Sequence, residues 1–166
     1  MTIELEKRSE VSESDILKVE EELRVEFSSE YRNFLIEYQD AIPLIDRKSC
    51  VILITWETDS PTEHSVDSFI SLDQLLRTWK FRDYMRDFYE TSLASDLISP
   101  DDYYQFERLW PIANLQHGDE GVIYIHSSLD GHLDKVFAFD NNSNALKIAD
   151  SFDIFLSHFQ PVEASA

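Results

Sequence analysis

Glycine, cysteine and positive charge are all scarce in this sequence. Its 166 residues contain three glycines, one cysteine, and 14 lysines and arginines against 33 aspartates and glutamates. A single cysteine cannot form an internal disulfide, and because Cys50 begins the apolar run 50–54 we expect a buried, unreactive thiol. The glycines form no phosphate-binding loop, and no serine lies in a nucleophile elbow. These absences argue against common nucleotide-binding and hydrolase sites.

Long apolar runs are missing as well. No stretch approaches the roughly 18 residues that a membrane-spanning helix needs, and residues 1–7 are too acidic and polar for a signal peptide. We therefore expect a cytoplasmic protein that does not enter a membrane. Hydrophobic residues make up 43% of the chain, including 11 Phe, 7 Tyr and 3 Trp, which is enough for one core. The simplest organisation is a single domain over residues 1–160 with a frayed tail at 161–166.

Acidic residues dominate the charge and give a formal net of −19 at pH 7. A field of this sign repels nucleic-acid phosphates and anionic lipids and favours cationic partners. Two stretches, 49–76 with five acids and 87–107 with six, contain no lysine or arginine. This clustering predicts acidic surface patches, although net negative charge also simply keeps many proteins soluble.

Hydrophobic spacing and capping residues predict an α+β fold. Clear helix starts occur at Ser12, with Asp15 completing a capping box, and at Ser71, with Gln74. The expected helices cover 12–25, 30–38, 71–89, 101–109 and 152–159, and the expected strands cover 50–56, 66–70, 122–127, 135–140 and 145–149. Because short turns join most strands, we expect a central, mostly antiparallel sheet. An N-terminal helix pair, a helical insert at about 71–109 and a C-terminal helix surround it.

The stretch 110–124 contains a turn with special backbone requirements, followed by a strand that we expect to be buried. Gly118 and Gly121 lie within it, and glycine marks positions that need positive φ or close backbone approach. Asp130 and Gly131 then predict a hairpin turn into the next strand.

Two groups of residues are candidate contacts for a protein partner. The acidic group comes from the region 57–67 and from the glycine-containing turn: Glu57, Asp59, Glu63, Asp67, Asp119 and Glu120. The aromatic group comes from the insert: Tyr103 and Tyr104, which cannot both face inward on one helix, with Tyr84, Tyr89 and Trp79 as further members. Exposed aromatic side chains are frequent interface anchors, although we assign Trp79 to the core.

Catalytic and metal-binding readings have less support. Asp130, His132 and Asp134 alternate along an extended segment and could hold a divalent metal, as could His117 with Asp119. Asp130 is already explained by the turn, and the five histidines follow no metal-site spacing, so a metal-dependent enzyme is the third hypothesis and we predict no cofactor. The only basic cluster is interpreted as a solvated helix face paired with Asp73, Asp83 and Asp87: Arg77, Lys80, Arg82 and Arg86.

Three segments carry a family resemblance: the helix pair from Ser12 to Tyr38 with its ending YRNFLIEY, the central WPIAN with Gly118 and Asp119, and the close VFAFD leading to IADSFDIFL. Together they resemble the SUKH superfamily of SMI/KNR-type domains. The chain departs from the family at 39–43, where QDAIP replaces the usual glycines, and at 81–109, which is longer and more aromatic.

The resemblance implies a binding protein without catalytic activity. Bacterial members of the superfamily are frequently immunity proteins that block toxins, often nucleases, delivered between competing cells. A nuclease cleft is cationic, so an acidic partner fits it, with fast electrostatically steered association. The expected partner is a toxin with a basic surface, bound by a monomer or weak homo-oligomer. The alternative is a regulatory or scaffolding module with an endogenous protein client.

Overall fold

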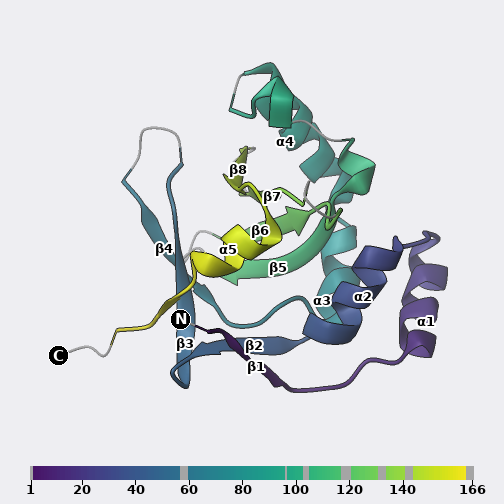
Figure 1. Ribbon diagram of the computed structural model, residues 1–166. Coiled ribbons are helices and arrows are strands. Elements are labelled where there is room, and N and C mark those ends of the chain that lie inside the picture. Colours follow the sequence, from purple (N-terminus) through teal and green to yellow (C-terminus); the bar gives the residue numbers. More distant parts are fainter. Residues whose placement is uncertain are drawn as a thin grey trace.

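The computed structural model describes residues 2–56, 60–95, 97–102, 105–116, 121–130, 134–140 and 144–163. Their strands form two antiparallel sheets with helices packed around them (Figure 1). The predicted α+β class is confirmed, with the strands divided between two sheets. No helix within these ranges is long and apolar enough to cross a membrane.

The first sheet combines both ends of the chain. Its strands β1 (Glu4–Lys7), β2 (Ala41–Ile45), β3 (Lys48–Ile54) and β4 (Thr62–Val66) pair in that order, and β9 (Gln160–Pro161) pairs with β3. Asp46 and Arg47 join β2 to β3 with φ values of 51° and 65°, as a two-residue hairpin turn of the primed type requires.

Three features of this sheet differ from the sequence-based expectations. β1 and β2 lie outside the predicted strands, since β1 is largely exposed and Pro43 in β2 argued for a loop. β4 occupies 62–66 instead of 66–70, because His64 faces inward and is paired with the Thr62 hydroxyl and the Gln116 carbonyl. Pro161, the first residue of the predicted tail, pairs with Cys50 in β3.

The second sheet is a meander of β5 (Trp110–Gln116), β6 (Val122–Ser127), β7 (Val136–Phe139) and β8 (Ala145–Ala149). Gly121 precedes β6 with φ 128°, so one glycine does meet a positive-φ requirement. The two sheets meet where Phe69 bridges Ala113 and the Ile70 N–H donates to the Ile112 carbonyl at 2.9 Å. The central WPIAN segment is therefore the seam of the fold.

Helices α1 (Glu13–Leu23) and α2 (Ser29–Tyr38) form the predicted N-terminal pair. Ser12 caps α1 in a capping box with Asp15, as predicted, and Ser28 caps α2. The C-terminal helix α5 (Phe152–Ser157) is capped by Ser151. Its Phe152 and Phe155 are buried in the main core, which also contains side chains of both sheets and of α1 and α2.

The helical insert is more broken than the sequence suggests. The helix predicted over 71–89 is divided into α3 (Leu72–Trp79), with the expected Ser71–Gln74 capping box, and α4 (Arg82–Ala94). The Lys80 N–H donates to the Arg77 carbonyl and the Phe81 N–H to the Thr78 carbonyl. These i→i+3 hydrogen bonds end α3 before residue 89. In place of the helix predicted over 101–109 there are short 3-10 turns at Pro100–Asp102 and Phe106–Arg108, because Gln105 is extended.

Candidate protein-binding surface

Two of the predicted acidic contacts fall within the described ranges. Glu63 lies on β4 and Asp67 directly follows it, and both are exposed. The other predicted contacts lie outside the described residues: Glu57, Asp59, Tyr103, Tyr104, Asp119 and Glu120.

The solvent face of the β3–β4 hairpin combines an acid with an apolar side chain. Leu53 is 48% exposed and is the Cα partner of Glu63, so the two side chains project from the same face. One face of β3 is therefore open to solvent at Leu53. Figure 1 shows the hairpin extending away from the second sheet. It offers a protruding surface with both negative charge and an apolar contact.

The aromatic residues of the insert separate into core and surface. Tyr89 is fully buried against Phe137 and Phe139, so it cannot contact a partner. Trp79 packs half-buried against the main core, as expected. Tyr84 remains, 60% exposed, and Phe81 beside it is 46% exposed. Among the aromatic side chains of the insert that the structure describes, the most exposed therefore lie at the start of α4.

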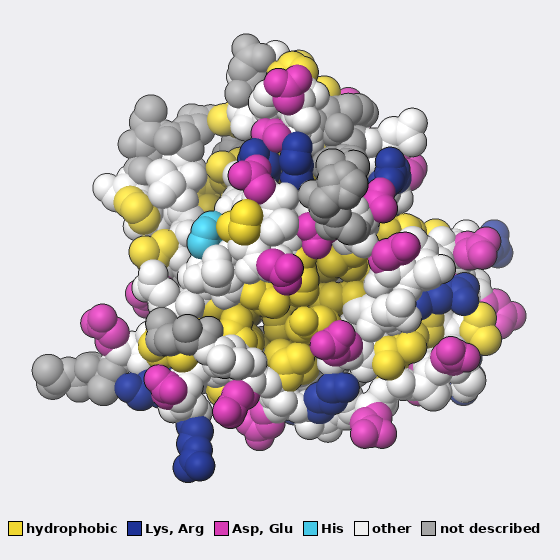
Figure 2. All heavy atoms as spheres, in the orientation of Figure 1, with side chains coloured by type: hydrophobic (Ala, Val, Ile, Leu, Met, Phe, Trp, Pro, Cys, Tyr) yellow, Lys and Arg dark blue, Asp and Glu magenta, His cyan; other side chains and the backbone are white. Residues whose placement is uncertain are grey.

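A third apolar surface lies on the face drawn in Figure 2, whose middle is apolar and surrounded by acidic side chains. Between α2 and α5, the Tyr38 ring stacks on Phe34 at 5.2 Å and meets Phe152 edge-on at 5.4 Å. Burial, together with the charges of Glu37 and Asp153, raises the pKa of Tyr38 above its usual 10.0. The phenol therefore stays neutral beside these acids.

The first residues of the WPIAN segment are buried in the core. Trp110 stacks on Tyr31 at 5.1 Å and on Trp79 at 6.3 Å, and Phe27 meets it edge-on. The Tyr31 hydroxyl donates to the carbonyl of Pro111 at 2.7 Å. Both Trp110 and Pro111 are buried. Trp110 and Pro111 hold α2, α3 and β5 together, and their buried side chains are not available to a partner.

Arg82 overturns the interpretation of the basic cluster as a wholly solvated helix face. It is 9% exposed, and its guanidinium lies 4.3 Å from the Trp79 ring and 4.7 Å from the Phe106 ring. It donates to the carbonyls of Leu109 and Phe106 at 3.1 and 3.3 Å. Burial, followed by repulsion from Arg86, lowers the pKa of Arg82 to about 10, so the buried group stays charged at neutral pH.

The rest of the cluster is a charged surface. Arg77 and Lys80 are exposed, and Arg86 pairs with Asp83 at 2.9 Å and with Glu107 at 3.2 Å. The pairing of Arg86 reduces the free positive charge of the cluster.

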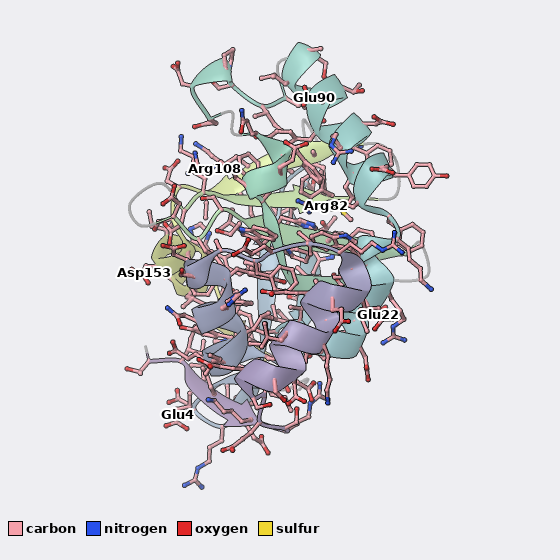
Figure 3. The ribbon with its side chains drawn as sticks, turned by 90° about the vertical axis from the view of Figure 1, so that its right-hand side faces the viewer. Glu4, Glu22, Arg82, Glu90, Arg108 and Asp153 are labelled. Atoms are coloured by element: carbon pink, nitrogen blue, oxygen red, sulfur yellow. The ribbon has the colours of Figure 1, made fainter. Side chains whose placement is uncertain are left out.

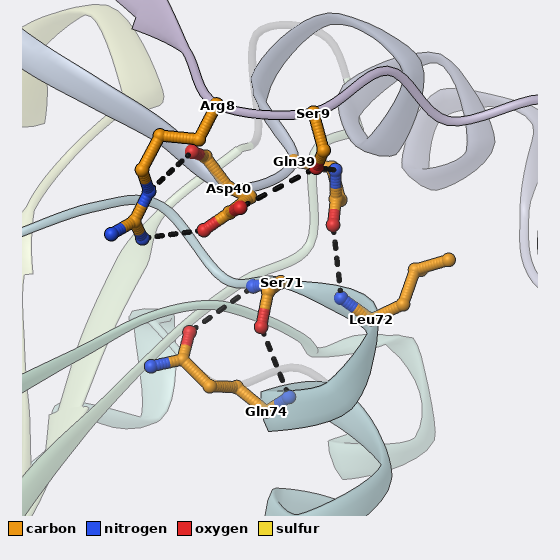
Figure 4. A network of polar contacts seen from close by, with 7 residues as sticks. All are labelled: Arg8, Ser9, Gln39, Asp40, Ser71, Leu72 and Gln74. Atoms are coloured by element: carbon orange, nitrogen blue, oxygen red, sulfur yellow. Dashed lines mark hydrogen bonds and ion pairs between the residues drawn. The ribbon is translucent and has the colours of Figure 1, made fainter.

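A polar groove of about 470 Å³ separates the end of β1 from the start of α3. The Gln39 side chain bridges it, donating to the Ser9 hydroxyl at 3.1 Å and accepting from the Leu72 N–H at 3.2 Å (Figure 4). Asp40 pairs with Arg8 and has φ 55°. This left-handed backbone stands where the family usually places glycine. Because these polar groups form hydrogen bonds and an ion pair with one another, we interpret the groove as structural. We call it the clasp, since it links the N-terminal segment to α3.

Reactive chemistry finds little support among the described residues, which contain no group of three metal-ligating side chains. Asp130 forms an ion pair with Arg108, and burial raises the pKa of Asp134; His132 and His117 lie outside the described ranges. Cys50 is buried as predicted, and burial raises its pKa. The thiolate is therefore disfavoured.

His126 was not singled out by the sequence as a buried group. Neither ring nitrogen of this fully buried residue has a hydrogen-bond partner in the described part of the chain. Burial and the charge of Arg82 hold its pKa well below 6.5. The ring lies against Phe106 and Phe139.

Comparison with known proteins identifies the family but no individual relative. No curated protein and no solved structure matches the chain. The model of the SMI1 / KNR4 family (SUKH-1) matches residues 10–158. That span includes the helix pair, the WPIAN seam and the C-terminal strand and helix, the three segments that carry the resemblance. The chain therefore belongs to the SMI1 / KNR4 (SUKH-1) family.

Proposed function

We propose that this chain is a non-enzymatic immunity protein that binds a cationic protein toxin, such as a nuclease, and masks its active site. Membership of the SUKH-1 family over residues 10–158 carries the proposal, because immunity to toxins is a frequent role of bacterial members. The net charge of −19 supports it. A nuclease must attract phosphate, and a strongly acidic inhibitor gains rapid association with such a cleft.

The proposed contact is the acidic side of the β3–β4 hairpin. Glu63 and Asp67 supply exposed carboxylates, and Leu53 opposite Glu63 supplies an apolar contact that can exclude water from the interface. The remaining predicted contacts complete the proposed set: Glu57, Asp59, Tyr103, Tyr104, Asp119 and Glu120.

Co-expression tests the function. The toxin encoded beside this gene is expressed in a sensitive cell with and without the chain, and we expect survival only with it. Equal killing in both cells would contradict the proposal. Measuring the affinity of the purified pair then tests the contact surface.

The double variant Glu63→Lys/Asp67→Lys is expected to weaken toxin binding by at least about a hundredfold, since it places like charges in the contact. The matched control is Glu26→Lys/Asp87→Lys, which changes the net charge equally at two exposed acids elsewhere. If the control weakens binding as much, long-range charge alone acts and the hairpin is not the contact.

A regulatory or scaffolding module is the second candidate. The exposed pair Phe81 and Tyr84 favours it, because aromatic anchors suit a partner that need not be cationic. Affinity capture from the native cell separates the two functions. An endogenous client that is lost with Phe81→Ser/Tyr84→Ser would support the module, whereas capture of a secreted toxin would not.

A further inference from the structure

Helices α1 and α2 lie side by side and leave a groove between them. Figure 3 shows the pair on the face turned toward the viewer. The groove has a volume of about 180 Å³ and is lined chiefly by Ile16, Leu17, Arg32, Asn33 and Ile36. It lies on the opposite side of the molecule from the β3–β4 hairpin (Figure 1).

The apolar lining of the groove is exposed on both helices. Leu17 on α1 is 54% exposed and Ile36 on α2 is 42% exposed, while Ile16 is 2% exposed. Two large aliphatic side chains thus flank one hollow, on a face that none of the described elements covers. A single large apolar side chain from a partner can enter there and bury surface on both helices.

The polar surroundings of the groove are negative. Arg32 lines it, but its Nε and Nη2 both donate to the Glu20 carboxylate at 2.8 Å, so its charge is already matched. Glu13 and Glu21 are exposed four residues before and after Leu17, which places them on the same face of α1. Together, α1 and α2 carry seven acidic and two basic side chains.

We infer that this groove binds an amphipathic, basic helix of a partner protein. Its apolar anchor inserts between Leu17 and Ile36, and its lysines or arginines face Glu13 and Glu21. A second copy of this chain would bring the same negative face and is repelled. Nucleic acid and anionic membranes are repelled for the same reason. The surface is separate from Glu63 and Asp67, so the inference does not depend on the toxin.

A peptide titration tests the inference directly. The probe is a helical peptide of about 14 residues built from leucine and lysine in amphipathic order; the control peptide replaces each lysine by glutamate. Backbone amide shifts are followed by NMR in the full-length chain. The leucine–lysine peptide is expected to shift residues around Leu17 and Ile36, with the affinity falling as salt rises. Shifts centred elsewhere, or none, would overturn the inference, as would equal binding of the glutamate peptide.

Matched variants locate the anchor. Leu17→Ser/Ile36→Ser is expected to raise the Kd of the leucine–lysine peptide at least about tenfold. Ile154→Ser/Val162→Ser changes two residues that are 42% and 41% exposed, and it should leave the Kd unchanged. Because all four side chains are exposed, melting curves should match wild type. Equal Kd values for the two double variants would refute the groove as the binding site.

Discussion

The Tyr31 hydroxyl donates a hydrogen bond of 2.7 Å to the carbonyl of Pro111, joining α2 to β5 between residues 80 positions apart. Tyr31 is fully buried, and burial raises its pKa well above 10.0, so it remains a hydrogen-bond donor. This bond connects two of the three segments by which the family is recognised. It indicates that Tyr31 and the WP dipeptide belong to one structural unit.

Tyr31→Phe should destabilise the fold without changing its shape. The substitution leaves the buried Pro111 carbonyl without its donor, which costs about 1–3 kcal/mol. Urea unfolding of Tyr31→Phe measures this loss. Tyr84→Phe is the control, because Tyr84 is 60% exposed, and it should stay within about 0.5 kcal/mol of wild type. Equal stabilities for the two variants would show that the Tyr31 bond contributes nothing.

Arg82→Ala should lower the free energy of unfolding by about 3 kcal/mol or more. It removes the stacking on Trp79 and Phe106 and the guanidinium hydrogen bonds to the carbonyls of Leu109 and Phe106. The Phe106 carbonyl keeps the Leu109 N–H as a donor. Arg82→Lys should recover only part of the stability lost in Arg82→Ala, since an ammonium group cannot reproduce the planar, forked hydrogen bonding of a guanidinium. Lys80→Ala, at an exposed position nearby, should be nearly neutral when measured by chemical denaturation.

Because His126 is buried, we expect the folded protein to lose stability as the pH falls. Its folded pKa lies well below 6.5, so below that pH the unfolded chain binds a proton that the folded chain does not. Stability therefore falls as pH decreases from about 6.5 toward the folded pKa, by up to about 1.4 kcal/mol per pH unit.

His126→Leu tests this by removing the titrating ring while keeping an apolar side chain. Urea unfolding at pH 7 and pH 5 should show a smaller pH dependence in the variant than in wild type. An identical pH dependence would mean that other groups account for all of it.

Gln39→Leu should loosen the clasp between the N-terminal segment and α3. Gln39 is 7% exposed, and its amide links the Ser9 hydroxyl to the Leu72 N–H. Losing both bonds should cost about 1–2 kcal/mol and should increase hydrogen exchange at Leu72. Gln105→Leu changes an exposed glutamine and should leave exchange at Leu72 as in wild type.

Much of the fold follows from local sequence signals. The caps at Ser12, Ser71 and Ser151 start helices where they were predicted, and the strand 145–149 agrees residue for residue with β8. Such signals work because a cap or an alternating strand is satisfied by residues a few positions away. The family resemblance likewise rests on short segments, and the match over residues 10–158 bears it out.

Only part of the candidate surfaces could be predicted from the sequence. The excess of acidic residues is evident from the composition. Glu63 and Asp67 are exposed, as a binding role requires. The α1–α2 groove could not be read in advance, because its two walls come from separate helices and the exposure of Leu17 and Ile36 depends on how those helices pack. Equally, Tyr89 shares its residue type with Tyr84 but is buried.

The sequence alone determined the α+β class, the helix starts, the negative charge and the family, since these depend on residue identity and short-range spacing. Only the tertiary structure decided that β1 and β9 complete the first sheet, and that Arg82 is buried among aromatic rings instead of exposed. Those outcomes depend on segments far apart in the chain meeting in the fold. No local periodicity encodes which distant carbonyls will receive a buried guanidinium or which strand edge a terminus will cover.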